Sequence, residues 1–183
     1  MIAEGGAASV TMRAIGGRLG VSRSAPYRHF ADRSALLVAV AAAGFEQLRD
    51  RLRALDAGRK RDSLARLRRI GEEYVRFALE NPAHYRLMYG KEALSRQNLP
   101  ELRDAANPLF DELVVVIRAS QRSGVIRRQD PQAQAYVAWS AVHGLASLLI
   151  EGQIQAEVDP DKLIRQTTRT LIEGMRVPKV VGN

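Results

Sequence analysis

Apolar residues recur every three to four positions along most of the chain, and polar residues fill the positions between them. This spacing matches the 3.6-residue period of an α-helix that buries one face. Between residues 62 and 80, for example, the apolar stripe consists of Leu67, Ile70, Tyr74, Phe77 and Ala78. No segment alternates strictly between apolar and polar residues, as a half-buried strand does. The pattern therefore predicts an all-α protein.

Capping residues, prolines and glycines predict where the helices begin and end. We expect two short helices, over residues 11–19 and 22–29, with a turn at Gly20 between them. Ser9 or Thr11 is the expected N-cap of the first helix, and Ser22 that of the second. Later helices are expected over residues 32–55, 62–80, 83–89, 101–123, 131–151 and 160–175.

A run of small and charged residues, 57–61, interrupts the helical periodicity. We predict a domain boundary there, between a small domain over residues 1–56 and a larger helical domain over residues 62–176. Residues 177–183 are expected to form a frayed tail.

The net charge of the chain indicates an anionic partner, which the helical pattern alone does not. The net charge is +8 and the pI is about 10.4. Residues 1–62 hold 11 Lys and Arg against 6 Asp and Glu, whereas the rest of the chain holds 17 against 14. An excess of this kind favours nucleic acid or a membrane surface as the partner.

Several function classes find no support in the sequence. There is no cysteine, which excludes disulfides and thiolate metal sites, and three scattered histidines do not form a metal centre. Glu72 and Glu73 are neighbours in sequence, but adjacent side chains on a helix do not face one another. We therefore expect no enzyme, no cofactor and no metal site.

The chain shows no signal for export or membrane insertion. The N-terminus lacks a basic segment followed by an apolar run. The most apolar stretch, residues 133–150, contains Gln134, Ser140, His143 and Ser147, whereas a span needs about 20 predominantly apolar residues. We read this stretch as a buried helix and expect a soluble, cytoplasmic protein with no membrane partner.

Two short helices joined by a glycine turn, in a basic N-terminal third, have the geometry that places one helix in a DNA major groove. This spacing alone is consistent with a DNA-binding unit and equally with a helical hairpin that has no binding function, since many helical hairpins bind nothing.

The residues of this segment resemble a known DNA-binding domain. The run from Val10 to Ile15, followed by Leu19–Leu37 with its Gly-Val-Ser, Tyr-x-His-Phe and Leu-Leu elements, resembles the DNA-binding domain of the tetracycline-repressor (TetR) family. Residues 82–89 and the segment Trp139–Leu145 look like the C-terminal domain of one branch of that family, named for its Trp-His-Gly signature.

The resemblance implies roles for particular side chains. A small core that fixes the angle between the two helices would consist of Ile15, Leu19, Val21 and Phe30. Contacts to the phosphate backbone would come from Thr11, Arg13, Tyr27, Arg28, His29 and Arg33. The end of the recognition helix that reaches base edges would carry Ser22, Arg23, Ser24 and Ala25.

Arg23 is the candidate for reading a guanine, a contact that contributes about 1–3 kcal/mol of discrimination when it is bidentate. Pro26 is expected to shape the recognition helix. Structural alternatives remain open, since Tyr27 and His29 can instead pack within the small domain. Arg28 and Arg33 can instead be solvated surface charges.

The chain departs from the family pattern in two places. The family has a complete helix before the segment that matches Thr11, whereas residues 1–9 resemble only the end of that helix and the following turn. Gly16 and Gly17 fall inside a predicted helix, where each glycine costs about 1 kcal/mol relative to alanine.

For the larger domain the resemblance implies a homodimer, formed through the last two long helices, that binds a small-molecule effector. Candidate effector contacts are Tyr74, Phe77, Met88, Phe110, Val114, Ile117, Trp139 and His143. The alternative is that these side chains are simply core. Two recognition helices about 34–36 Å apart match successive major grooves of a palindromic operator in double-stranded DNA.

We therefore expect a transcriptional regulator, a repressor that its effector releases from DNA. The alternative is a helical homodimer that binds a small molecule or a protein and no longer binds DNA.

Overall fold

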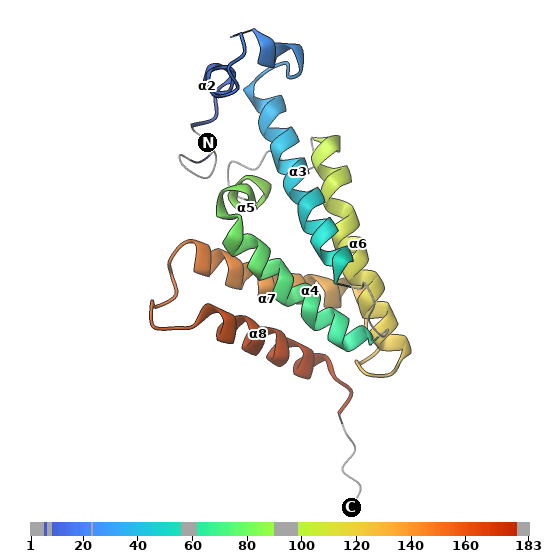
Figure 1. Cartoon of the computed structure of the whole chain (residues 1–183). Helices are drawn as coiled ribbons and strands as arrows, with labels where there is room; N and C mark the ends of the chain where they lie inside the picture. The colour runs from blue at the N-terminus through green and yellow to red at the C-terminus, as the bar shows by residue number, and fades with distance from the viewer. Residues whose placement is uncertain (1–5, 7–8, 23, 56–61, 90–98, 179–183) are drawn as a thin grey trace, which may run out of the picture. The chain divides into compact units, whose positions relative to one another are not determined.

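Figure 1 shows the computed structural model of the chain, which describes residues 6, 9–22, 24–55, 62–89 and 99–178. In chain order the elements are α2 (Met12–Arg18), the 3-10 helix η2 (Ala25–Arg28), α3 (Arg33–Ala54), α4 (Ser63–Glu80), α5 (Pro82–Tyr89), α6 (Pro100–Arg122), α7 (Pro131–Ile150) and α8 (Pro160–Met175). Within these described residues, β pairing is confined to an isolated bridge between Ile126 and Arg176. The prediction of an all-α fold is confirmed.

Aspartate side chains cap the N-termini of four helices. Asp159 Oδ1, for example, accepts a hydrogen bond from the backbone N–H of Asp161 at 2.9 Å. The same arrangement is made by Asp32, Asp62 and Asp130. Each carboxylate satisfies an N–H that has no partner inside its own helix. The predicted starts of α3, α4, α7 and α8 are therefore confirmed.

The second short helix differs from the prediction. In place of an α-helix over residues 22–29, the chain forms the shorter η2. Pro26 lies in its first turn and has no N–H, so it cannot make the α-helical bond to the carbonyl of Ser22. Instead Ala25 N donates to Ser22 O at 3.0 Å, a tighter 3-10 bond. The prediction that Ser22 is the N-cap is wrong, because Ser24 holds that position and makes no side-chain capping bond.

The described residues pack into two compact units. The first lies within Met1–Gln47 and Glu80–Asn107, and the second within Leu48–Leu79 and Pro108–Asn183. The domain boundary predicted at residues 57–61 falls outside the described residues and stays a prediction.

The small core of the first unit differs from the predicted one. Val10 and Met12 are 3% and 4% exposed, and Pro26 is buried in the same unit. Leu19 and Val21, in contrast, are 68% and 45% exposed, so the prediction that they are buried is wrong.

Leu19 is the C-cap of α2, and its backbone N–H still donates to Ile15 O at 3.0 Å. Its backbone therefore continues the helical turn, and the local conformation does not explain why its side chain is exposed while Met12 and Gly16 are buried. Gly20 then turns the chain with a φ of 65°, a conformation that glycine adopts without strain. Of the other two predicted core residues, Ile15 and Phe30 are half-buried.

In the second unit α7 and α8 pack against one another. Their contact with α4 is close at Gly71, where a Cβ would lie 3.1 Å from Thr168 Cγ2 and 3.3 Å from Val142 Cγ1. The hydroxyl of Thr168, which is 2% exposed, donates to the carbonyl of Ile164 at 3.0 Å. The buried polar group is thereby satisfied inside its own helix.

By length and composition alone, α7 is apolar enough to cross a membrane, and it is the one such helix in the described residues. A single helix of this kind is weak evidence, because the core helix of a soluble protein meets the same criteria. In this chain α7 lies against α8, and residues such as Ala135, Val142 and Ala146 are buried.

Candidate nucleic-acid interface and effector site

The N-terminal site is built on two short elements that touch each other. Thr11 Oγ1 accepts from the backbone N–H of Ala14 at 3.1 Å and so begins α2. Beyond the turn at Gly20, Val21 N donates to Gly16 O at 3.0 Å. This bond ties the turn to α2, and the chain then enters η2, which contacts α2. The arrangement is that of a helix-turn-helix.

Most of the predicted DNA-contacting residues lie on the exposed surface of this unit. Tyr27 is 58% exposed, which is unusual for a large aromatic side chain unless a partner covers it. Ala25 is half-buried, and the other exposed members of the set are Thr11, Arg13, Ser22, Ser24, Arg28, His29 and Arg33. Arg23, the predicted guanine reader, lies outside the described residues.

Some of these side chains already have partners within the unit. Ser22 Oγ lies 3.2 Å from Ser24 Oγ, within hydrogen-bonding distance. Arg33 Nε donates to the carbonyl of Val10 at 2.7 Å, which links the start of α3 to the residue before Thr11. Arg33 therefore stabilises the unit in addition to any contact that it makes with DNA.

Four of the predicted effector contacts form one connected cluster in the second unit. Trp139 Nε1 donates to Tyr74 Oη at 3.1 Å, and Tyr74 Oη lies 2.9 Å from His143 Nδ1. The ring centroids of Phe110 and Trp139 are 6.2 Å apart in an edge-on arrangement. The cluster joins α4, α6 and α7, and its polar atoms bind one another.

The remaining candidates lie in the core. Val114 is 6% exposed, and neither Ile117 nor Phe77 has any exposed area. The guanidinium of Arg51 covers the ring of Phe77, with Cζ 5.3 Å from the ring centroid. Met88 belongs to the first unit, so the structure does not group it with the others.

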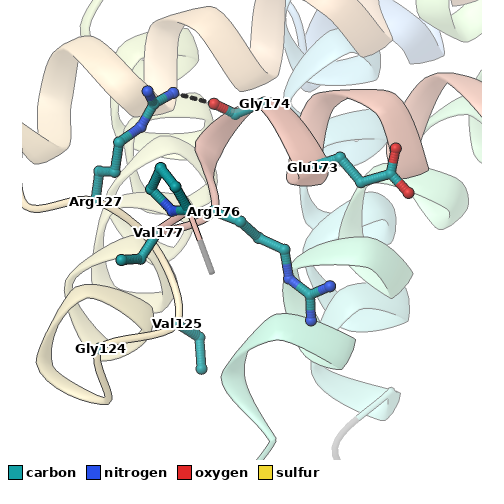
Figure 2. Close-up of a pocket in the computed structure, with 8 residues that line it drawn as sticks. Gly124, Val125, Arg127, Glu173, Gly174, Arg176 and Val177 are labelled. Atoms are coloured by element: carbon teal, nitrogen blue, oxygen red, sulfur yellow. Dashed lines mark hydrogen bonds between the residues drawn. The ribbon is translucent and has the colours of Figure 1, made fainter. Parts of the chain in front are cut away.

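An open groove of about 570 Å³ lies in a different part of the second unit, and Figure 2 shows residues that line it. It is lined by residues from the loop after α6 and from the end of α8: Gly124, Val125, Arg127, Glu173, Gly174, Arg176, Val177 and Pro178. The side chain of Arg127 donates to the carbonyl of Gly174, as the dashed line in Figure 2 marks. None of the predicted effector contacts lines this groove.

No role was predicted for the arginines of α3 and α4, although several of them are half-buried. Arg51 pairs with Glu73 at 3.4 Å, and Arg66 pairs with Glu112. The sequence did contain a signal for these ion pairs, namely the high density of arginines on both sides of residues 57–61.

Comparison with protein families gives two matches. Residues 1–40 match the profile described as bacterial regulatory proteins, tetR family. Residues 67–171 match the profile described as tetracyclin repressor-like, C-terminal domain.

Among curated proteins, the chain is similar to the nucleoid occlusion factor SlmA of Vibrio vulnificus strain YJ016, at 32% identity over 123 residues. The SlmA protein of Vibrio cholerae is 30% identical over 122 residues. Each alignment covers 67% of this chain and 61% of the relative, so the match spans less than two thirds of these relatives.

Among solved structures, the fold is similar to a protein of unknown function from Rhodococcus sp. RHA1, with a TM-score of 0.85 and 28% identity over 96% of this chain and 90% of that one. The regulator PfmR from Thermus thermophilus has a TM-score of 0.72 at 20% identity, over 96% of this chain and 94% of that one. The similarity to PfmR shows that the two chains have the same fold.

Proposed function

Because the chain belongs to the TetR family of bacterial regulatory proteins, we propose that it is a DNA-binding transcriptional regulator. In this proposal it represses transcription from a palindromic operator, and a small-molecule effector releases it. Its place of action is the cytoplasm, where the operator is. We assign it no catalytic activity, as is general for the family.

The observation that carries the proposal is the set of exposed side chains on the helix-turn-helix. A tyrosine that is 58% exposed lies beside exposed Arg28 and His29, at the end of a short helix whose Pro26 is buried. Phosphate contacts are made by side chains of these types, and they set the register of a protein on the duplex. We assign this role to Thr11, Arg13, Tyr27, Arg28, His29 and Arg33.

Base reading is assigned to residues 22–25, with Arg23 as the contact to guanine. The support for this assignment is the match of residues 1–40 to the family profile and the exposure of Ser22 and Ser24.

We further propose that the protein is a homodimer that pairs through α7 and α8. Supporting this, α7 has a stripe of apolar and small residues at helical spacing, formed by exposed Val137, Ser140 and Leu148 together with half-buried Gly144. Val137 is 57% and Leu148 is 46% exposed. Pairing of two copies along this stripe removes apolar surface from water, which favours association.

The effector site is assigned to the second unit around Tyr74, Phe110, Trp139 and His143. The connected rings and hydrogen bonds of these residues support the assignment, because an effector that inserts there must rearrange contacts between three helices. Trp139, His143 and Gly144 also support a place in the Trp-His-Gly branch of the family. Phe77, Val114 and Ile117 would form the floor of the site.

A second candidate function has its own observation. Leu19 and Val21 are exposed on the helix-turn-helix, where the described residues leave them uncovered. A domain that lacks part of its packing is less able to hold its recognition helix. In that case the protein is a helical homodimer that binds a small molecule or another protein, but not DNA.

A mobility-shift titration with the DNA upstream of the protein's own gene separates the two functions. The regulator binds this DNA more tightly than scrambled duplex, and its affinity falls steeply as salt rises because phosphate contacts release counterions. The Arg23→Ala substitution is expected to remove selectivity at one base pair. Arg28→Ala is expected to weaken binding to all sequences alike.

Arg68→Ala is the matched control, because Arg68 is a 54% exposed arginine on α4 in the other unit. Equal and weak binding to every duplex, unchanged by Arg28→Ala, would instead support the module that does not bind DNA.

A further inference from the structure

An exposed tyrosine lies at the edge of the aromatic residues of the second unit. Tyr136 of α7 is 54% exposed, and its ring packs against that of Phe110 of α6, with the ring centroids 4.5 Å apart and the planes tilted by 34°. Phe110 is half-buried and meets the ring of Trp139 edge-on, at 6.2 Å between centroids. Phe110 therefore connects an exposed ring to one that is partly enclosed.

Beyond Trp139 the contacts continue through polar atoms. Trp139 Nε1 donates to Tyr74 Oη at 3.1 Å, and Tyr74 Oη lies 2.9 Å from His143 Nδ1. We call Tyr74, Phe110, Trp139 and His143 the effector cluster. An indole N–H can only donate, so a shift of the Trp139 ring alters its bond to Tyr74. The contacts thus extend without interruption from the exposed Tyr136 to α4.

Tyr136 also borders the apolar stripe that we assign to pairing of two copies. Val137, the next residue, is 57% exposed, and Ser140, four residues after Tyr136, is exposed as well. Trp139 and His143 follow Tyr136 by three and seven residues, so they lie towards the other side of it on the helix. Tyr136 therefore lies between the pairing stripe and the effector cluster.

A second copy of the chain is the partner that fits this surface. Helix α7 has no Asp, Glu, Lys or Arg, although 26% of the chain is charged, so it contains no group that would orient a charged partner. On the stripe, the small residues Ser140 and Gly144 lie between the larger Val137 and Leu148. Two identical faces of this kind can approach closely at their centres and bury the larger side chains on either side. Such a self-complementary face suits two-fold pairing.

We propose that a second copy covers Tyr136, and that Phe110 couples this interface to the effector cluster. This proposal rests on the proposed function in one respect, namely that two copies pair along α7. In a single copy an exposed ring exchanges between rotamers in solution. A second copy that covers Tyr136 holds the ring against Phe110 and, through Phe110, restricts Trp139. By linkage, an effector that moves Trp139 changes the affinity between the copies by the same factor by which pairing changes the affinity for the effector.

The first test uses the fluorescence of Trp139, which is the single tryptophan of the chain. Leu148→Glu places a charge on the stripe nine residues from Trp139 and is expected to give monomers in sedimentation equilibrium. In these monomers the emission of Trp139 is expected to shift to longer wavelength, and acrylamide to quench it more strongly, because the neighbouring rings move more freely and admit water. The control is Val115→Glu on α6, which is expected to remain dimeric with the emission of the wild type.

The second test is a double-mutant cycle that removes the connecting ring. Phe110→Leu keeps an apolar side chain but separates Tyr136 from Trp139. In this background Leu148→Glu is still expected to give monomers, but without a further shift of the emission. Tyr136→Leu has the same expected result and changes a side chain that is 54% exposed, so it repeats the test without altering the core.

The coupling and the dimer on which it rests fail on different results. A monomeric wild type, or a dimeric Leu148→Glu variant, shows that pairing along α7 is wrong, and the coupling is rejected with it. If Leu148→Glu is monomeric and its emission is unchanged, pairing stands and the coupling is overturned. The same holds if the shift persists in both the Phe110→Leu and the Tyr136→Leu backgrounds. None of these measurements contains DNA, so the proposed DNA-binding function is tested separately.

Discussion

At the scale of single residues, a close contact between two helices of the first unit depends on a glycine. A Cβ built on Gly44 of α3 would lie 2.7 Å from Met88 Sδ and 3.8 Å from His84 Cβ of α5. Met88 is 1% exposed, so its side chain has little space to move away. Gly44 thus lets α5 approach α3, despite the lower helix propensity of glycine.

We expect Gly44→Ala to destabilise the protein by about 1–3 kcal/mol, because the added methyl group overpacks a filled core. Chemical denaturation measures this change. Gly174→Ala on α8 is the control, since a Cβ there meets no atom within 4 Å, and it should be neutral or stabilising by up to about 1 kcal/mol. Equal effects in the two variants would contradict the packing argument.

At the scale of elements, sequence signals decide where the helices start, and packing decides their exposed faces. Helix α8 begins where Asp159 Oδ1 accepts from the N–H groups of Asp161 and Lys162, at 2.9 and 3.3 Å. Pro160 follows the cap, at a position where a missing N–H costs nothing. Its inward stripe includes Ile164, which is 1% exposed.

Asp159→Ala is expected to cost about 0.5–2 kcal/mol of stability, because both N–H groups lose their acceptor. Asp159→Ser keeps an acceptor oxygen at the cap and should retain most of the stability. Thermal and denaturant unfolding of the three proteins test this prediction. An alanine variant as stable as the wild type would show that water replaces the cap without loss.

At the scale of the whole molecule, the function proposed here needs two copies. One helix-turn-helix contacts a single half-site, and linking two of them raises the affinity through effective concentration. The stripe on α7 is the surface that we assign to this pairing, and α6 carries one comparable exposed apolar side chain, Val115 at 55%.

Val137→Glu is expected to place a charge in the dimer interface and convert the protein to monomers, as sedimentation equilibrium would show. Its affinity for operator DNA should fall by about a hundredfold or more. Val115→Glu, on a similarly exposed valine of α6, should leave both the dimer and the affinity intact. A dimeric Val137→Glu variant would move the interface away from α7.

The fold class and most helix limits could be predicted from the order of residues, because they depend on local chemistry. The Asp-Pro pairs at Asp130 and Asp159, and the glycine turns at Gly124 and Gly152, act within a few residues of where they stand. The residues of the helix-turn-helix were also recognisable from their order in the chain.

The buried stripe of α4, from Leu67 to Ala78, was predicted from its helical spacing. Packing in three dimensions determines which charges are paired and whether an apolar residue at a helix end is covered, and these could not be predicted. Leu19 is as apolar as Met12 and lies in the same helical turn pattern, but Leu19 is 68% exposed and Met12 is 4% exposed. The ion pairs of Arg51 with Glu73 and of Arg66 with Glu112 were also missed, because their partners lie 22 and 46 residues apart in sequence. Pairing of this kind depends on distances in space, which a helical pattern does not contain.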